Sequence, residues 1–157
     1  MTAGSDQLSA LVAEELDWPL FPAAEAACAD IVAAHGETVR AVLFYGSCLR
    51  EGTDQDKILD FYVLADSPAK ANGSAILGFF NWLLPPNVYY RETAYEGRTV
   101  RTKYALMGFE QFRRAMQSRL NVSFWARFSQ PAALAFARSD EDRGLIAQAL
   151  GHALVTF

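Results

Sequence analysis

Two stretches of the chain combine residue types that can bind a phosphate and a metal ion. The first is an apolar run, residues 41–45, that ends in the small pair Gly46-Ser47. The second is the apolar run 58–63, which carries one carboxylate, Asp60. Because glycine has no side chain, a phosphate can approach the backbone amides at Gly46, and Ser47 adds a hydroxyl. Asp60 is then expected to hold Mg²⁺ against that phosphate.

Together these residues suit nucleotidyl transfer. An in-line attack on the α-phosphate of a nucleoside triphosphate needs a metal ion to neutralise charge and fixed groups to position the triphosphate. Asp60, at the edge of a strand, can hold the metal ion, and the Gly46-Ser47 turn can position the triphosphate. The sequence therefore predicts that a nucleoside triphosphate binds here and that a nucleotidyl group is transferred.

The second strand offers only one acid. Alternate residues of a strand face the same side, so a second metal ligand is expected at position 62, where the chain has Tyr62. A tyrosine cannot replace a carboxylate. Two alternatives therefore stay open: Asp60 accepts backbone amides at a sheet edge, or the domain is a degenerate transferase that binds a nucleotide without catalysis.

Length and composition indicate one soluble-type domain that covers residues 1–157. The hydrophobic content of 52% and the charged content of 20% exclude disorder. No apolar segment reaches the roughly 18 residues of a membrane span. Residues 1–17 contain four acids and no base, which is the wrong charge for a secretory or mitochondrial signal. We expect a cytoplasmic protein, or one held peripherally at the inner face of a membrane.

Charge is distributed unevenly along the chain. Residues 1–90 contain 4 Lys or Arg and 12 Asp or Glu, a net −8, and residues 91–157 contain 10 and 6, a net +4. Acids near the proposed metal site and bases elsewhere suit an enzyme whose substrates are phosphates, although bases that solvate helices explain most single residues equally. No dense basic patch is interleaved with aromatics, so no nucleic-acid partner is expected.

The two cysteines, Cys28 and Cys48, are too far apart for a CxxC metal motif and too few for a disulfide framework. Both are expected to be reduced. Because Cys48 lies close to the Gly-Ser turn, a reactive thiol is an open alternative at that position.

The elements that must position these residues follow from apolar periodicity. Apolar residues three and four apart predict helices, at residues 6–17, 23–35, 69–84, 109–120 and 140–156. Apolar, β-branched and aromatic runs predict strands, at residues 39–45, 57–64, 88–95 and 99–107. Residues 49–57 are expected to form a polar loop, and the element at 124–137 is of unassigned type. His35 is expected to interact with the helix dipole at the end of its helix, before Gly36.

The predicted fold is α/β (α+β): a mixed sheet, largely antiparallel beyond the first two strands and flanked by helices. Helices are expected over residues 1–37, the catalytic sheet over 38–107, and further helices over 108–157.

The whole pattern resembles the mitochondrial translocator-assembly-and-maintenance type of phosphatidate cytidylyltransferase, a soluble nucleotidyltransferase family that makes CDP-diacylglycerol. That family has a Tyr-Gly-Ser turn, a short polar loop and an apolar strand in which the position two after the acid is not acidic. It then has a Val-Tyr-Tyr-like strand, a turn with Gly, a Lys-Tyr strand, and an Arg followed four residues later by Pro. The matching segments are Tyr45-Gly46-Ser47, Leu59-Asp60-Phe61, Val88-Tyr89-Tyr90, Gly97-Arg98, Lys103-Tyr104, Arg127 and Pro131.

This resemblance implies a Mg²⁺-dependent enzyme that transfers CMP from CTP to phosphatidic acid at a membrane surface and releases pyrophosphate. It implies that Asp60 coordinates Mg²⁺, that Gly46 and Ser47 contact the triphosphate, and that Lys103 approaches a phosphate. Arg127 would pair with the phosphatidate phosphomonoester, for which a guanidinium fork is suited.

Several alternatives remain for these basic residues and for the acceptor. Lys57 can reach the triphosphate or can simply mark the start of its strand. Lys103 can be an exposed strand lysine, and Arg127 a helix-surface arginine. The acceptor can also be a small alcohol or a protein side chain.

The chain departs from the family in two places. Cys48 stands where the family usually has a glycine, which is expected to narrow the space near the phosphates. The family continues through a longer helical region, so the chain is expected to be a truncated form or a short, bacterial-type relative. The apolar-aromatic residues 79–84, beside Pro85-Pro86, are expected either in the core or at a membrane interface.

Overall fold

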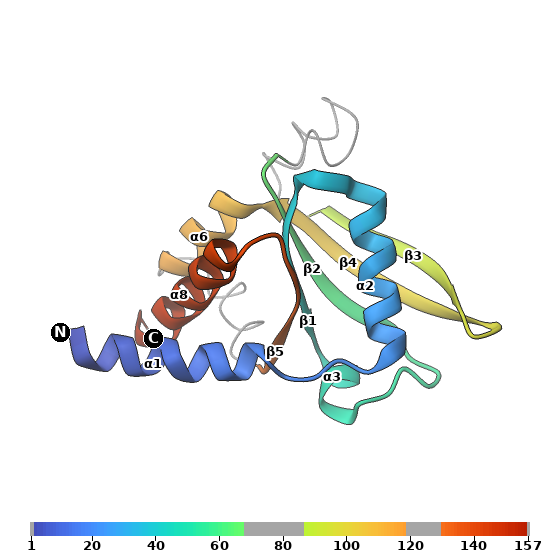
Figure 1. Cartoon of the computed structure of the whole chain (residues 1–157), viewed down its shortest axis with the longest axis horizontal. Helices are drawn as coiled ribbons and strands as arrows, with labels where there is room; N and C mark the ends of the chain where they lie inside the picture. Colours follow the sequence, from blue (N-terminus) through green and yellow to red (C-terminus); the bar gives the residue numbers. More distant parts are fainter. Residues whose placement is uncertain (1, 68–86, 119–129, 157) are drawn as a thin grey trace.

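Five strands form one mixed sheet in the computed structural model, which describes residues 2–67, 87–118 and 130–156 (Figure 1). The strands are β1 (Val39–Tyr45), β2 (Leu59–Ala65), β3 (Asn87–Tyr95), β4 (Arg98–Gly108) and β5 (Ala132–Ala137). Their order is β3-β4-β2-β1-β5. The prediction of a mixed, mostly antiparallel sheet flanked by helices is confirmed. The parallel pair is β2 with β4, whereas the first two strands are antiparallel, contrary to the prediction.

Helices cover both faces of this sheet. They are α1 (Thr2–Leu16), α2 (Pro22–His35), α3 (Ser47–Glu51), α6 (Phe109–Gln117) and α8 (Asp140–Thr156), with a short 3-10 turn η1 (Gly36–Thr38). Figure 1 shows α2 on one face and α1, α6 and α8 together on the other. We call these the α2 face and the α8 face.

Strand alternation divides the core between the two faces. In β2, Phe61 and Val63 pack with α2, while Tyr62 and Leu64 pack with α1, α6 and α8. All four side chains are fully buried. Because alternate residues of a strand share a face, the buried residues of β2 show on which face a more polar residue, such as Asp60, must lie.

Several helices and strands begin or end at residues that are typical of helix termini and hairpin turns. Pro22 occupies the first turn of α2, where its missing N–H costs nothing, and Gly36 ends that helix with φ +66°. The Ser139 hydroxyl accepts a hydrogen bond from the Asp142 amide (3.1 Å), which is typical of an N-cap and occurs here at the start of α8. Glu96 and Gly97 both have positive φ, so β3 and β4 are joined by a two-residue hairpin turn.

Two predictions about local structure are wrong. Residues 47–51 form α3 rather than joining the polar loop, because Gly46 and Gly52, both at positive φ, turn the chain at each end of one short helix. Residues 132–137, within the range predicted to be helical, form β5, which pairs with the outer edge of β1. The predicted helix 69–84, the cluster 79–84 and Arg127 lie outside the described residues.

A search of the described residues for a helix long and apolar enough to cross a lipid bilayer finds none.

Candidate functional site

Gly46 and Asp60 lie against each other at the end of the β1–β2 pair. Tyr45, the last residue of β1, is the register partner of Asp60 in the antiparallel ladder. A Cβ atom added at Gly46 would be 3.2 Å from Oδ2 of Asp60. The backbone at Gly46 also has φ +92°, a conformation that side chains rarely tolerate. Glycine is therefore required here both by the backbone and by the space that the carboxylate occupies.

Lys103 lies on the other side of Asp60. The two residues are register partners in the parallel β2–β4 ladder. Ala105 and Met107 of β4 pack on the α8 face with Tyr62 and Leu64 of β2, so alternation places Asp60 and Lys103 on that same face. Asp60 is half-buried and Lys103 is exposed. Lys103 forms no ion pair with any residue that the structure describes, so its ammonium is available to an anion beside Asp60.

The donor set around Asp60 fits a metal ion that arrives with its substrate. Within residues 2–67, 87–118 and 130–156, no three Cys, His, Asp or Glu side chains gather closely enough to enclose a metal ion. Mg²⁺ usually binds through one or two carboxylates, keeps several waters and takes further oxygens from substrate phosphates. One carboxylate beside a turn without a side chain fits such an ion and does not fit an all-protein metal centre.

The other two predicted nucleotide-binding residues lie close to this pair along the chain. Ser47 is the first residue of α3 and is half-buried. Lys57 lies two residues before β2, and its ammonium pairs with Glu51 at the end of α3. Because an acid of the protein already neutralises Lys57, its charge is less available to a phosphate than that of Lys103.

Cys48 is buried, and its effect on the space near the phosphates stays a prediction. Its side chain is 2% exposed and belongs to the core on the α2 face, where the charge of Asp60 still acts on the thiol. The thiol lies 3.5 Å from the Ile58 carbonyl oxygen, to which it donates. Burial raises the pKa of the Cys48 thiol, so the structure gives no support to the reactive alternative.

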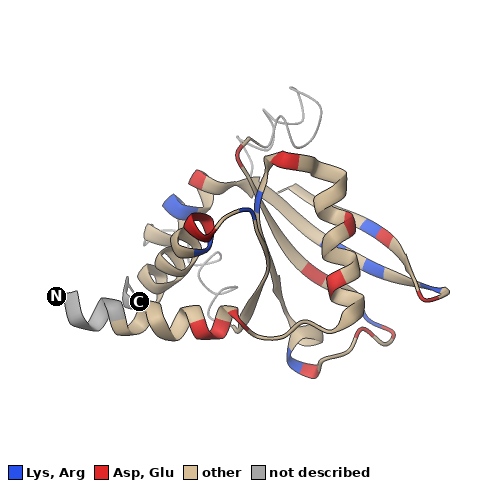
Figure 2. Ribbon diagram, in the orientation of Figure 1, with Lys and Arg blue, Asp and Glu red and all other residues tan. Residues whose placement is uncertain are grey.

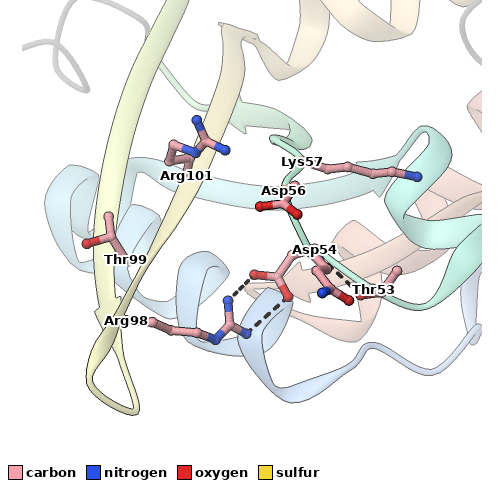
Figure 3. A pocket seen from close by; sticks show the side chains of 8 residues that line it. Thr53, Asp54, Asp56, Lys57, Arg98, Thr99 and Arg101 are labelled. Atoms are coloured by element: carbon pink, nitrogen blue, oxygen red, sulfur yellow. Dashed lines mark hydrogen bonds and ion pairs between the residues drawn. The ribbon is translucent and has the colours of Figure 1, made fainter.

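A polar cleft of about 500 Å³ adjoins the site where the loop before β2 faces the start of β4 (Figure 3). Every described side chain that lines it is polar or charged: Thr53, Asp54, Gln55, Asp56, Lys57, Arg98, Thr99 and Arg101. Arg98 holds Asp54 through two hydrogen bonds, one of them 3.0 Å between Nη2 and Oδ1. These bonds lower the pKa of Asp54, so the pair stays ionised and fixes one wall of the cleft.

Arg98, Arg101 and the acids of this loop are candidate site residues that no sequence motif indicated. Arg101 could have been found from the alternation of side chains along β4. It lies two residues from Lys103 and therefore shares its face of the sheet. The pairing of Arg98 with Asp54, which are 44 positions apart, depends on how the loop folds and leaves no local signal.

Charged residues are distributed unevenly among the elements. Figure 2 shows acids on α2, bases on β4 and both on β3, whereas β5 is uncharged. The predicted separation of acids and bases along the sequence therefore does not become two separate surfaces. Acidic α2 residues pair with bases of the later half, as in the Asp30–Arg91 ion pair.

The chain matches no model of a known protein family, and no curated protein matches it significantly in sequence.

Proposed function

We propose that the chain is a Mg²⁺-dependent nucleotidyltransferase that transfers CMP from CTP to phosphatidic acid. The observation that carries the transferase part is the contact between the Gly46 turn and the Asp60 carboxylate. A triphosphate at the turn and a metal ion at the carboxylate would share one ligand, as nucleotidyl transfer requires. The choice of CTP and phosphatidic acid rests on the resemblance of residues 39–131 to the cytidylyltransferase family.

Each residue of the site has its own expected role. Gly46 leaves room for a phosphate at the backbone, Ser47 offers a hydroxyl, and Lys103 offsets negative charge beside Asp60. When bound at Asp60, Mg²⁺ would neutralise charge on the α-phosphate. A phosphate oxygen of the acceptor attacks the α-phosphorus and forms the new P–O bond. The bond from that phosphorus to the bridging oxygen breaks, and pyrophosphate leaves with its electron pair.

Neither of the two histidines of the chain, His35 and His152, lines the cleft, and a lining without an imidazole favours a phosphate as acceptor. A phosphomonoester has a second pKa near 6, so at pH 7 it is already a nucleophile and needs no general base. An alcohol acceptor would need one. His35, which could have served, instead places Nε2 2.8 Å from the Tyr104 hydroxyl on the α2 face.

A second candidate is a nucleotide-binding module without catalysis. One observation favours it: the described residues supply a single carboxylate at the metal position, with Tyr62 where a second would stand. Against it, Lys103 is exposed on the same face as Asp60 without a protein partner among the described residues.

The test is transfer from CTP labelled on its α-phosphate, with Mg²⁺ and phosphatidic acid in detergent. We expect labelled CDP-diacylglycerol from the wild type and at least a 100-fold loss in Asp60→Asn, the order of effect of removing one transition-state stabilising group. Asp140→Asn, an exposed acid at the start of α8, is the matched control and should retain activity. Nucleotide binding without any product would favour the module, and equal transfer to an unrelated alcohol would move the acceptor assignment away from phosphatidic acid.

A further inference from the structure

We propose that the polar cleft beside Asp60 binds the phosphomonoester of the acceptor, with Arg101 as the residue that holds it. This inference rests on the proposed function, since it names the substrate that would occupy the half of the site not assigned to the nucleotide. It is carried by three observations: the free charge of Arg101, its position relative to Asp60, and the polarity of the cleft.

Among the basic residues of the described lining, Arg101 is the one that no described residue pairs with. Of the three basic residues in the lining, Arg98 is held by Asp54 and Lys57 by Glu51. Arg101 is exposed, and no described residue forms a hydrogen bond or an ion pair with it. Its register partner on β3 is Glu92, whose carboxylate accepts a hydrogen bond from the Tyr90 hydroxyl (2.9 Å) and forms no ion pair with Arg101.

Figure 3 shows how the three basic side chains of the lining differ in direction. Arg98 reaches Asp54, and Lys57 runs away from Arg101. The Arg101 side chain extends from β4 on the wall opposite to Asp56. With Arg98 paired to Asp54 and Lys57 to Glu51, the charges of the described lining that form no ion pair are Arg101 and Asp56, and an anion would bind at the guanidinium of Arg101.

The position of Arg101 suits the acceptor rather than the nucleotide. Asp60 lies on β2 between β1, which carries the Gly46 turn, and β4, which carries Lys103 and Arg101. In an in-line transfer the attacking and leaving oxygens lie on opposite sides of the phosphorus. If the departing pyrophosphate lies at Gly46, the attacking phosphate must come from the β4 side. Arg101 is about 7 Å along that strand from Lys103, on the same face.

The side chains that line the cleft are suited to bind a phosphate-containing headgroup. A guanidinium fork binds a phosphate through two parallel hydrogen bonds, and such charge-assisted bonds are the strong ones. The described residues of the lining include no apolar side chain, so acyl chains would have to extend away from this part of the cleft. The expected ligand is therefore the phosphomonoester of a glycerol phosphate, whether free or as the headgroup of a lipid.

The test combines a binding titration with kinetics, using Arg101→Gln and, as matched control, Arg114→Gln, an exposed α6 arginine that pairs with no described residue. Calorimetric titration without CTP would use two probes: glycerol 3-phosphate, and short-chain phosphatidic acid below its micelle concentration. We expect wild type and Arg114→Gln to bind alike, and Arg101→Gln to bind either probe at least about tenfold more weakly, the cost of one charge-assisted hydrogen bond. Arg101→Lys, which keeps the charge without the fork, should be intermediate.

In the transfer assay, Arg101→Gln should raise the KM for phosphatidic acid by a similar factor and leave the KM for CTP unchanged. An increase in the KM for CTP alone, or unchanged binding of both probes, would overturn the inference while leaving the proposed function intact. Conversely, binding of the probes that depends on Arg101, in a protein that makes no transfer product, would support the phosphomonoester site and remove the proposed function. Circular dichroism of each variant would verify its fold.

Discussion

Oδ2 of Asp60 lies 3.2 Å from the point where Gly46 would carry a Cβ atom. The turn after β1 and the acid of β2 are therefore one structural unit, although 14 positions separate them in the sequence. Two constraints meet at Gly46: a backbone at φ +92° and a neighbouring carboxylate. The effects of these two constraints can be separated experimentally, because other glycines of the chain have a positive φ but no neighbouring carboxylate.

Gly46→Ala should damage both stability and function. The strained backbone should lower the free energy of unfolding by about 1 to 2 kcal/mol. The added methyl should also push the Asp60 carboxylate aside by a few tenths of an ångström. A displacement of about 1 Å at a reacting centre can cost on the order of 100-fold in rate, so a smaller but measurable loss of activity is expected. Urea unfolding and the transfer assay measure the two effects.

Gly36→Ala is the matched control for this substitution. Gly36 has φ +66° and ψ −149°, close to the backbone region of Gly46, and nothing lies within 4 Å of its added Cβ. It should lose stability to a similar extent and keep its activity. If Gly36→Ala and Gly46→Ala lost activity equally, the contact with Asp60 would have no functional role.

Local sequence signals predicted most of the fold. The bounds of β1 match the prediction because an apolar run between Gly36 and Gly46 leaves little choice of ends. The β3–β4 hairpin was found for a similar reason, since Glu96-Gly97 can adopt the positive φ values that its turn needs. β5 was missed because its sequence, Ala-Ala-Leu-Ala-Phe-Ala, has high helix propensity, and only pairing with β1 makes it a strand.

The candidate site was predictable only in part. Gly46 and Asp60 stand out because small and acidic residues interrupt apolar runs, and the structure does bring them together. The orientation of Cys48 could not be read from its position after Gly46-Ser47, because it depends on the rotation of α3, which turns the thiol toward the α2 face. The cleft was missed because its walls come from two segments whose contact is non-local.

Arg40 and Asp142 should form the interaction whose loss most destabilises the fold. Asp142 is 2% exposed, Arg40 donates to its Oδ1 through Nε (2.8 Å), and the Arg40 guanidinium stacks 3.7 Å from the centre of the Phe109 ring. Arg40→Met would leave the buried carboxylate with only the longer ion pair to Arg138, whose Nε lies 3.6 Å from Oδ2. Breaking a buried pair typically costs about 3 to 5 kcal/mol, and the remaining pair should keep the loss toward the lower end. Urea unfolding of Arg40→Met measures this loss.

Two comparisons show whether the unpaired charge is the cause. Arg113→Met breaks an exposed pair with Glu110 on α6 and should cost less than about 0.5 kcal/mol. The double variant Arg40→Met/Asp142→Leu should regain part of the lost stability, since it removes the orphaned carboxylate as well. A double variant less stable than Arg40→Met would contradict this account.

Asp30 should contribute to stability only above acid pH. A hydrogen bond from Arg91 (2.5 Å), opposed by burial and joined by one from Thr93 (2.9 Å), lowers the pKa of Asp30 below its usual value. A carboxyl group whose pKa is lower in the folded protein stabilises it above the unfolded pKa of about 3.9, and this stability is lost as the pH falls through the folded value. Because both side chains are about one-third exposed, the effect should stay below about 1 kcal/mol.

The measurement is the free energy of unfolding of wild type and of Asp30→Asn between pH 7 and pH 2. The difference between the two proteins should be constant down to about pH 5 and should shrink at lower pH, where the wild-type carboxylate becomes protonated. A difference that grew as the pH fell would mean that the carboxylate is destabilising in the folded protein.

Neither cysteine should react in the native protein. Burial raises the pKa of Cys28 to about 12, and it raises the pKa of Cys48 as well, so little thiolate exists at pH 8. A chromogenic disulfide reagent should therefore label both thiols only after a denaturant is added. Rapid native labelling of Cys48 would show that the segment around α3 opens, and protection by CTP would then place the nucleotide beside it.

Neighbouring residues of β4 should separate function from structure, because their side chains face opposite sides of the sheet. Lys103 lies beside Asp60, so Lys103→Met should lower kcat/KM by about 100-fold with little change in stability. Tyr104 packs on the α2 face, stacked 5.4 Å from Tyr89 and hydrogen-bonded to His35, which is a more specific role than the predicted helix-dipole interaction of His35. Tyr104→Phe should therefore cost about 1 kcal/mol of stability and leave transfer intact. Transfer kinetics and thermal unfolding of both variants test this division. The opposite result, with activity lost in Tyr104→Phe and kept in Lys103→Met, would move the reacting centre to the other face of the sheet.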